Sequence, residues 1–126
     1  MIHRIDHIVL TTARTGQCID FYTRVLGMKL ERFGEGRMAL KFGEQKINLH
    51  EKGREFEPKA HVPAPGGLDL CFIADIPLAE VIARLNAAGI AIIEGPVMKT
   101  GACYPIRSVY VRDPDLNLIE ISERAV

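Results

Sequence analysis

Two polar side chains interrupt apolar stretches near opposite ends of the chain. His7 lies in the apolar run of residues 4–10, and Glu120 lies in the apolar run of residues 116–122. A polar side chain buried without a partner costs roughly 1–3 kcal/mol, so two such residues need each other or a common ligand. Imidazole and carboxylate groups without thiolates suit Mn, Fe(II), Co, Ni or Zn. The pair therefore predicts a shared site for a divalent metal ion.

The elements that must position these residues follow from the hydrophobic pattern. In the first half, we predict a strand, a helix and three further strands over 4–10, 17–26, 28–33, 37–42 and 46–51. The second half repeats this order with a strand at 68–74, a helix that begins after Pro77 and ends before Gly89, and strands at 90–94, 106–112 and 116–122. Residues 95–105 are predicted to form a long loop.

This internal repeat predicts an α+β fold made of two tandem βαβββ modules. The modules cover residues 1–52 and 67–126, and a linker rich in proline and glycine covers residues 53–66 within one domain. Each sheet is expected to be apolar on the face that packs against its helix, and the other face is expected to line a cleft.

Superposition of the two repeats brings further polar residues to equivalent positions. Asp69 takes the place of His7, and Asn48 takes the place of Glu120. Because side chains two residues apart on a strand share a face, His50 points the same way as Asn48. We predict a metal site built from His7 and Glu120 and completed by His50 or Asp69. Glu120 and Asp69 are also the candidate catalytic carboxylates, since a carboxylate of suitable pKa can transfer protons.

Three residues are candidates for contact with a substrate. Asn48 would present its amide to the cleft, and Tyr104 and Arg107 lie in or beside the long loop. A loop of this kind could cover the site, and its cations, Lys99 and Arg107, could meet an anionic substrate.

Composition excludes several classes of function. The chain has 16 basic and 16 acidic residues, so its formal net charge is 0, and no basic face indicates nucleic acid. No apolar run approaches the ~20 residues of a membrane span, and no signal peptide is recognised. The three cysteines are widely spaced and form no C-x-x-C pair. The odd number and wide spacing of the cysteines indicate a reducing, cytoplasmic environment.

Several motifs together resemble the vicinal oxygen chelate superfamily, which includes glyoxalase I, bleomycin-resistance proteins and extradiol dioxygenases. The motifs that carry the resemblance are Asp6-His7-Ile8, Phe21-Tyr22 with Val25-Leu26-Gly27, and the closing stretch from Asp113-Pro114-Asp115 to Glu120. Residues 46–50, 55–59 and 94–96 are similar to the glyoxalase domain-containing protein 5 type, whose members are described as lactoylglutathione lyases.

The resemblance implies a homodimer and a metal site in which His7 and Glu120 match family ligands. Asn48 and Asp69 stand where glyoxalase I has a glutamate and a histidine. The implied function is a divalent-metal-dependent lyase or isomerase that binds a small oxygenated substrate on the metal. Two alternatives remain open: a non-catalytic protein that binds an antibiotic or toxin, and an Fe(II) dioxygenase. The sequence leaves the metal, the substrate and the use of glutathione undetermined.

Overall fold

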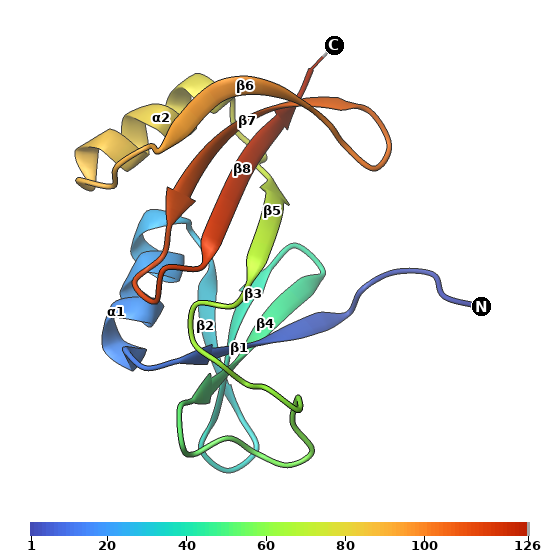
Figure 1. The fold of residues 1–126 in the computed structure, drawn as a ribbon, viewed down its shortest axis with the longest axis vertical. Helices are drawn as coiled ribbons and strands as arrows, with labels where there is room; N and C mark the ends of the chain where they lie inside the picture. Colours follow the sequence, from blue (N-terminus) through green and yellow to red (C-terminus); the bar gives the residue numbers. More distant parts are fainter. Residues whose placement is uncertain (126) are drawn as a thin grey trace. The chain divides into compact units, whose positions relative to one another are not determined.

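The structure is a computed structural model that describes residues 1–125. It consists of two compact units, unit 1 (Met1–Gly67) and unit 2 (Leu68–Val126). Each unit contains one helical segment and a four-stranded mixed sheet in the order β-α-β-β-β (Figure 1). The predicted α+β fold of two tandem modules is therefore confirmed.

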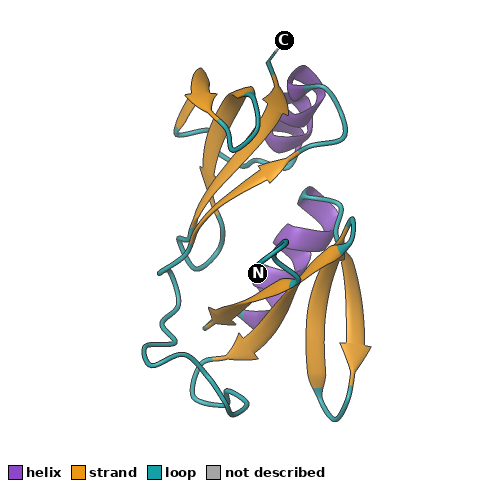
Figure 2. Cartoon of the chain, turned by 90° about the vertical axis from the view of Figure 1, so that its right-hand side faces the viewer, coloured by secondary structure: helices purple, strands orange, loops and turns teal. Residues whose placement is uncertain are grey.

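Unit 1 contains β1 (His7–Thr12), α1 (Thr15–Asp20), the π-helical segment η1 (Phe21–Val25), β2 (Lys29–Phe33), β3 (Arg37–Phe42) and β4 (Gln45–Glu51). Its strands are arranged in the order β1-β4-β3-β2, with β1 and β4 parallel and the other pairs antiparallel. Leu10, Leu40 and Ile47 are fully buried and form the core between the sheet and the helical segment, which covers one face of the sheet (Figure 2).

Unit 2 contains β5 (Asp69–Ile73), α2 (Leu78–Ala87), β6 (Glu94–Thr100), β7 (Pro105–Arg112) and β8 (Leu118–Arg124). The strand order β5-β8-β7-β6 repeats that of unit 1, again with one parallel pair, β5 and β8. The buried Leu78, Val81 and Leu85 of α2 lie on the side of the helix that contacts β7 and β8. Between β4 and β5 no helix or strand is assigned in the described chain.

The predicted helix over residues 17–26 is present, but its second half has a wider backbone. The amide of Leu26 donates to the carbonyl of Phe21, five residues earlier, at 3.1 Å. Phe21 and Tyr22 are both buried and meet edge to face at 5.0 Å between ring centroids. A π-helical turn rotates neighbouring side chains differently from an α-helix, and here two consecutive aromatic rings enter the core.

The predicted strand at 90–94 and loop at 95–105 are wrong. The strand β6 runs from Glu94 to Thr100 at the edge of the sheet, and only the tip of its hairpin with β7 is loop. Gly95 and Pro96 indicate a loop when read in sequence, yet here they form an irregularity in the pairing between Glu94 and Val97. An edge strand accommodates proline at such a position because no neighbouring strand needs its missing N–H.

Within the described residues, no helix is long and apolar enough to cross a membrane.

Candidate active site

Glu120 lies near the middle of β8, on the face of the unit 2 sheet that α2 does not cover. Its neighbours Ile119 and Ile121 are buried at 0% and 5% exposure and point into the core, so Glu120 points to the opposite face. The register places Cys71 of β5 on one side of Glu120 and Tyr110 of β7 on the other.

A buried turn fixes this register. Oδ1 of Asp113 accepts the backbone N–H groups of Asp115 and Asn117, both at 2.9 Å, and Oδ2 accepts Nδ2 of Asn117 at 2.8 Å. The carbonyl oxygen of the Asn117 side chain accepts the backbone N–H of Leu68 at 2.8 Å. Asn117 therefore ties the start of β5 to the turn before β8, three residues before Glu120.

Short hydrogen bonds connect Glu120 to buried hydroxyl groups. Oγ of Ser108 donates to Oε2 of Glu120 at 2.6 Å and lies 2.6 Å from Oγ of Ser122. Oγ of Ser122 lies 3.4 Å from Sγ of Cys71. Both serines are completely buried, and the four groups form a connected polar chain on this face of the sheet.

The same environment changes the pKa values of two neighbouring groups. Loss of solvent, the hydrogen bond with Glu120 and the negative charge of that residue raise the pKa of Tyr110 to about 12. Desolvation is also the main cause that raises the pKa of the Cys71 thiol. Tyr110 and Cys71 therefore stay protonated at neutral pH, and Tyr110 is a hydrogen-bond donor toward Glu120.

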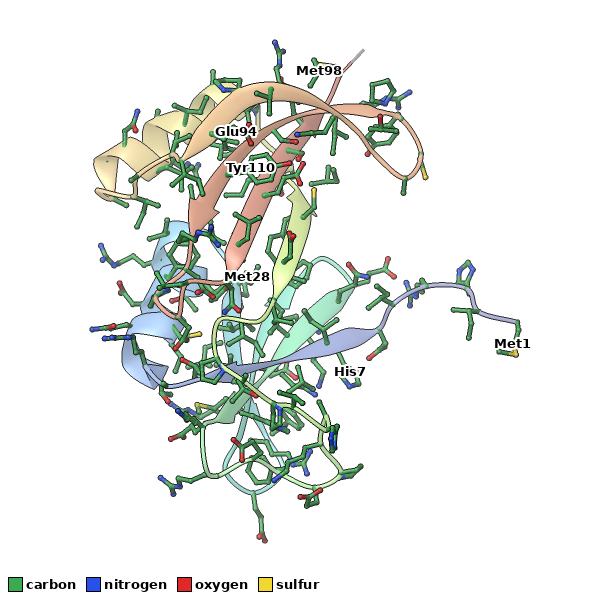
Figure 3. All side chains as sticks on the ribbon, viewed as in Figure 1. Met1, His7, Met28, Glu94, Met98 and Tyr110 are labelled. Carbon is green, nitrogen blue, oxygen red and sulfur yellow. The ribbon has the colours of Figure 1, made fainter. Side chains whose placement is uncertain are left out.

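Two hollows meet at Glu120 and Tyr110. The first has a volume of about 510 Å³ and is lined by Cys71, Ile73, Lys99, Thr100, Gly101, Ala102, Cys103, Tyr104, Ile106, Tyr110 and Glu120. The second, of about 500 Å³, is lined by Asp69, Ile93, Glu94, Tyr110, Arg112, Leu118 and Glu120. Glu94 and Tyr110 are paired in register and lie beside each other in unit 2 (Figure 3). These volumes lie within the usual ~300–1,000 Å³ of small-molecule sites.

The other candidate residues of unit 2 lie in different places. Asp69 lines the second hollow on the same face as Glu120, because it is two residues from Cys71 on β5. Tyr104 lines the first hollow at the hairpin tip, where the guanidinium of Arg124 lies 4.7 Å from its ring centroid. Arg107 points to the opposite face of β7 and pairs with Glu123 at 2.9 Å, so the structure does not bring it to Glu120.

In unit 1, His7 begins β1 with its ring half exposed (Figure 3). Its Nδ1 lies 2.8 Å from Oδ2 of Asp6, and this hydrogen bond is the main cause that lowers the pKa of the Asp6 carboxyl. Because an ionised carboxylate only accepts hydrogen bonds, Nδ1 donates to Asp6, and Nε2 lies outside this hydrogen bond. A carboxylate that orients a histidine in this way is typical of metal-binding histidines.

Asn48 and His50 share the sheet face of His7 but have different surroundings. Asn48 lies between Val9 and Ala39 in register, and its Oδ1 is buried without a hydrogen-bond partner among the described residues. His50 is almost buried, and its ring meets that of Phe56 edge to face at 5.7 Å. Desolvation first, and then the positive charge of Arg37, lower the pKa of His50, so its imidazole is neutral at pH 7.

The donor groups on these faces fit a divalent metal in chemical type. Nε2 of His7 lies outside the hydrogen bond with Asp6, and Oε1 of Glu120 lies outside the hydrogen bond with Ser108. In residues 1–125, no three His, Cys, Asp or Glu side chains gather closely enough to hold an ion. Within unit 1, His7 pairs with Lys46 and Thr11 pairs with His50. The two histidines are therefore about 13 Å apart along the strands, at about 3.3 Å per residue.

Sequence reasoning missed Ser108, Ser122 and Tyr110 as partners of Glu120. The signal was present, because Ser108 and Tyr110 alternate with valines along β7 and therefore share one face. Counting back across the hairpin turn would have placed Tyr110 opposite Glu120 and Ser108 opposite Ser122. Cys71, which the sequence did not single out, is exposed in the first hollow.

Comparison with known proteins identifies related chains. Residues 4–121 match the family described as "Glyoxalase/Bleomycin resistance protein/Dioxygenase superfamily". Glyoxalase domain-containing protein RDO1 of Mycosarcoma maydis is 56% identical over 121 residues, which cover 96% of this chain and 68% of that protein. Virulence protein STM3117 of Salmonella typhimurium strain LT2 is 54% identical over 123 residues, which cover 98% of this chain and 85% of that protein.

Solved structures agree with these matches. The crystal structure of STM3117 has a TM-score of 0.97 at 53% identity and covers 99% of both chains. A lactoylglutathione lyase from Agrobacterium tumefaciens has a TM-score of 0.73 at 25% identity, with 95% of this chain and 92% of that chain covered.

Proposed function

Because the chain belongs to the glyoxalase/bleomycin resistance protein/dioxygenase superfamily, we propose that it is a divalent-metal-dependent lyase or isomerase of the glyoxalase type. Its substrate would be a small oxygenated molecule with a weakly acidic C–H group. The observation that carries this proposal is the setting of Glu120, a carboxylate at the edge of two hollows with hydroxyl donors aimed at it. The likeness to a lactoylglutathione lyase supports the reaction class.

The residues around Glu120 support a role in proton transfer. Oε2 is held by Ser108, which leaves Oε1 to take a proton from a substrate and return it. Tyr110 keeps its proton to high pH and donates it to Glu120, which helps to hold this carboxylate beside the hollows. Asp69 lines the adjoining hollow and is the second carboxylate that could carry the proton.

For the metal, we propose His7 and Glu120 as ligands, with Asp69 as the residue that completes the set, because His50 lies about 13 Å from His7 along the strands of unit 1. The hydrogen bond from His7 to Asp6 supports this role, because it fixes the ring and leaves Nε2 free to bind. A bound divalent ion would polarise two neighbouring substrate oxygens and stabilise the negative charge that forms when the C–H proton leaves.

Metal content is the measurement that tests the proposal. Wild-type protein, purified and then supplied with Mn, Fe, Co, Ni or Zn, should retain about one ion per chain by elemental analysis. His7→Ala and Glu120→Ala should lose it. Matched controls are His61→Ala and Glu35→Ala, which remove an exposed histidine and an exposed glutamate and should retain the metal. Asp69→Ala should also weaken retention of the metal, whereas His50→Ala should leave it unchanged.

Assays of turnover and oxygen uptake distinguish the proposed enzyme from the two alternatives, a dioxygenase and a non-catalytic binding protein. A metal-loaded protein that converts hemithioacetals without oxygen uptake supports the lyase or isomerase. Oxygen uptake with Fe(II) would instead identify a dioxygenase. Absence of bound metal from the wild-type protein under all five conditions would refute the proposed enzyme, and small molecules should then be tested for binding without turnover.

We also propose a homodimer. Unit 2 exposes the apolar side chains of Ile73, Ile93 and Met98, each more than half accessible, and burial of such surface favours association. Light scattering should give twice the chain mass of 14.0 kDa across micromolar concentrations. A single-chain mass throughout that range would contradict this assembly.

A further inference from the structure

The buried serines beside Glu120 need an explanation beyond sheet formation. Ser108 and Ser122 are 0% exposed, and along the strands they alternate with core residues such as Val109 and Ile121. A buried hydroxyl without a partner costs roughly 1–3 kcal/mol, so apolar residues would serve better here if only packing mattered. The two hydroxyls instead bond to each other and to Glu120, both at 2.6 Å.

The number of protons fixes the direction of these bonds. An ionised carboxylate only accepts, and a serine hydroxyl has one proton to donate. The proton of Ser108 is used on Oε2 of Glu120, so Ser122 must donate to Ser108. The proton of Ser122 is then also used, and in the 3.4 Å contact with Cys71 the thiol must be the donor. All three donors therefore point toward Glu120.

We infer that Ser108 and Ser122 are positioning residues, whose one-way hydrogen-bond chain from Cys71 fixes the carboxylate of Glu120 by its Oε2 atom. With Oε2 held, Oε1 is the oxygen that meets a metal ion or a substrate proton. A distance of 2.6 Å is typical of the stronger, charge-assisted class of hydrogen bond. The inference rests on the role of Glu120 in the proposed function and adds the residues that orient it.

The hydrogen-bond chain that leads to Glu120 has one end, Cys71, at the surface of the first hollow. Cys71 is exposed there, whereas both serines are sealed from solvent. A hydroxyl at position 71 can replace the thiol as donor, and an alanine cannot. Cys71→Ser should therefore preserve the orientation of Glu120, and Cys71→Ala should weaken it less than loss of Ser108 does.

The first test needs no metal. Protein labelled with ¹³C at glutamate side chains gives a carboxyl resonance for Glu120, which is assigned by its loss in Glu120→Gln. At a fixed pH of 8, Ser108→Ala should shift or broaden this resonance, and Ser122→Ala should do so to a smaller extent. Ser108→Thr keeps the hydroxyl and should restore the wild-type position. Thr12→Ala removes an equally buried hydroxyl from unit 1 and should have no effect.

The second test measures metal affinity by competition with a chelating dye. Ser108→Ala should weaken binding about tenfold or more, as loss of a group that orients a metal ligand typically does, while Ser108→Thr stays near wild type. If Ser108→Ala does not fold, Ser122→Ala and Cys71→Ala carry both tests. An unchanged Glu120 resonance in the folded variants overturns the inference. A wild-type protein without metal affinity overturns the proposed function but leaves the first test valid.

Discussion

Replacement of Asn117 by alanine tests whether the turn before β8 fixes the position of Glu120. Asn117 is 1% exposed, and its side chain accepts from the N–H of Leu68 and donates to Oδ2 of Asp113. The variant leaves both partners without this bond in a place that water barely reaches. At roughly 1–3 kcal/mol for each of the two unsatisfied groups, we expect a loss of about 2–6 kcal/mol in the free energy of unfolding.

Such a loss is a large part of the ~5–15 kcal/mol that stabilises a typical protein. Urea unfolding followed by circular dichroism would measure it, and calorimetry should show a melting temperature lower by roughly 10 °C or more. Asn86→Ala is the matched control, because Asn86 is exposed on α2 and its loss should change stability by less than about 0.5 kcal/mol. If Asn117→Ala were no less stable than Asn86→Ala, the turn could not be what fixes the register.

Three further predictions concern unit 2. Because the pKa of Tyr110 is raised to about 12 in the folded protein, its protonated side chain stabilises the fold fully below the pKa of an unfolded tyrosine, near 10. This stabilisation is lost as the pH rises toward about 12. Tyr110→Phe should remove that loss from unfolding curves measured at alkaline pH. Gly95→Ala should lower the free energy of unfolding in urea by more than about 3 kcal/mol, because a Cβ at φ +106° would meet the backbone of β7. Gly36→Ala is the control: this residue has φ +70° but lies in open space, so its replacement should cost about 1–2 kcal/mol. Arg107→Ala breaks a largely exposed pair with Glu123 and should change stability by at most about 1 kcal/mol without changing metal affinity.

The repeat in the sequence was enough to predict the fold, because hydrophobic period and turn residues agree in both halves. Gly27 and Gly89 end the two helical segments with positive φ angles of 79° and 73°, as their sequence positions indicated. The strand at β6 was missed for a specific reason. Gly95 and Pro96 disfavour regular pairing, and only the edge position of β6 and the irregular register beside β7 make them compatible with a strand.

The site could be predicted only where a charged residue interrupts an apolar run. Glu120 stands out in this way, whereas serine and tyrosine occur on many strand surfaces and attract no notice individually. Their role depends on which residue lies opposite them across the hairpin. If the predicted register were shifted by one residue, the side chain of Ser108 would be placed on the face that packs into the core. The buried pair formed by Asp113 and Asn117 sets that register, and its hydrogen bonds cannot be read from composition or period.

The repeat-related strands explain why the two modules carry different polar groups at equivalent positions. Glu120 lies between Cys71 and Tyr110, and it accepts hydrogen bonds from Tyr110 and from Ser108. Asn48 lies between Val9 and Ala39, which offer none, and its Oδ1 is left without a partner. A carboxylate at position 48 would be a buried charge without compensation, which costs far more than an unpaired amide oxygen. The acid therefore belongs in the module that surrounds it with donors, and the neutral amide belongs in the module that does not.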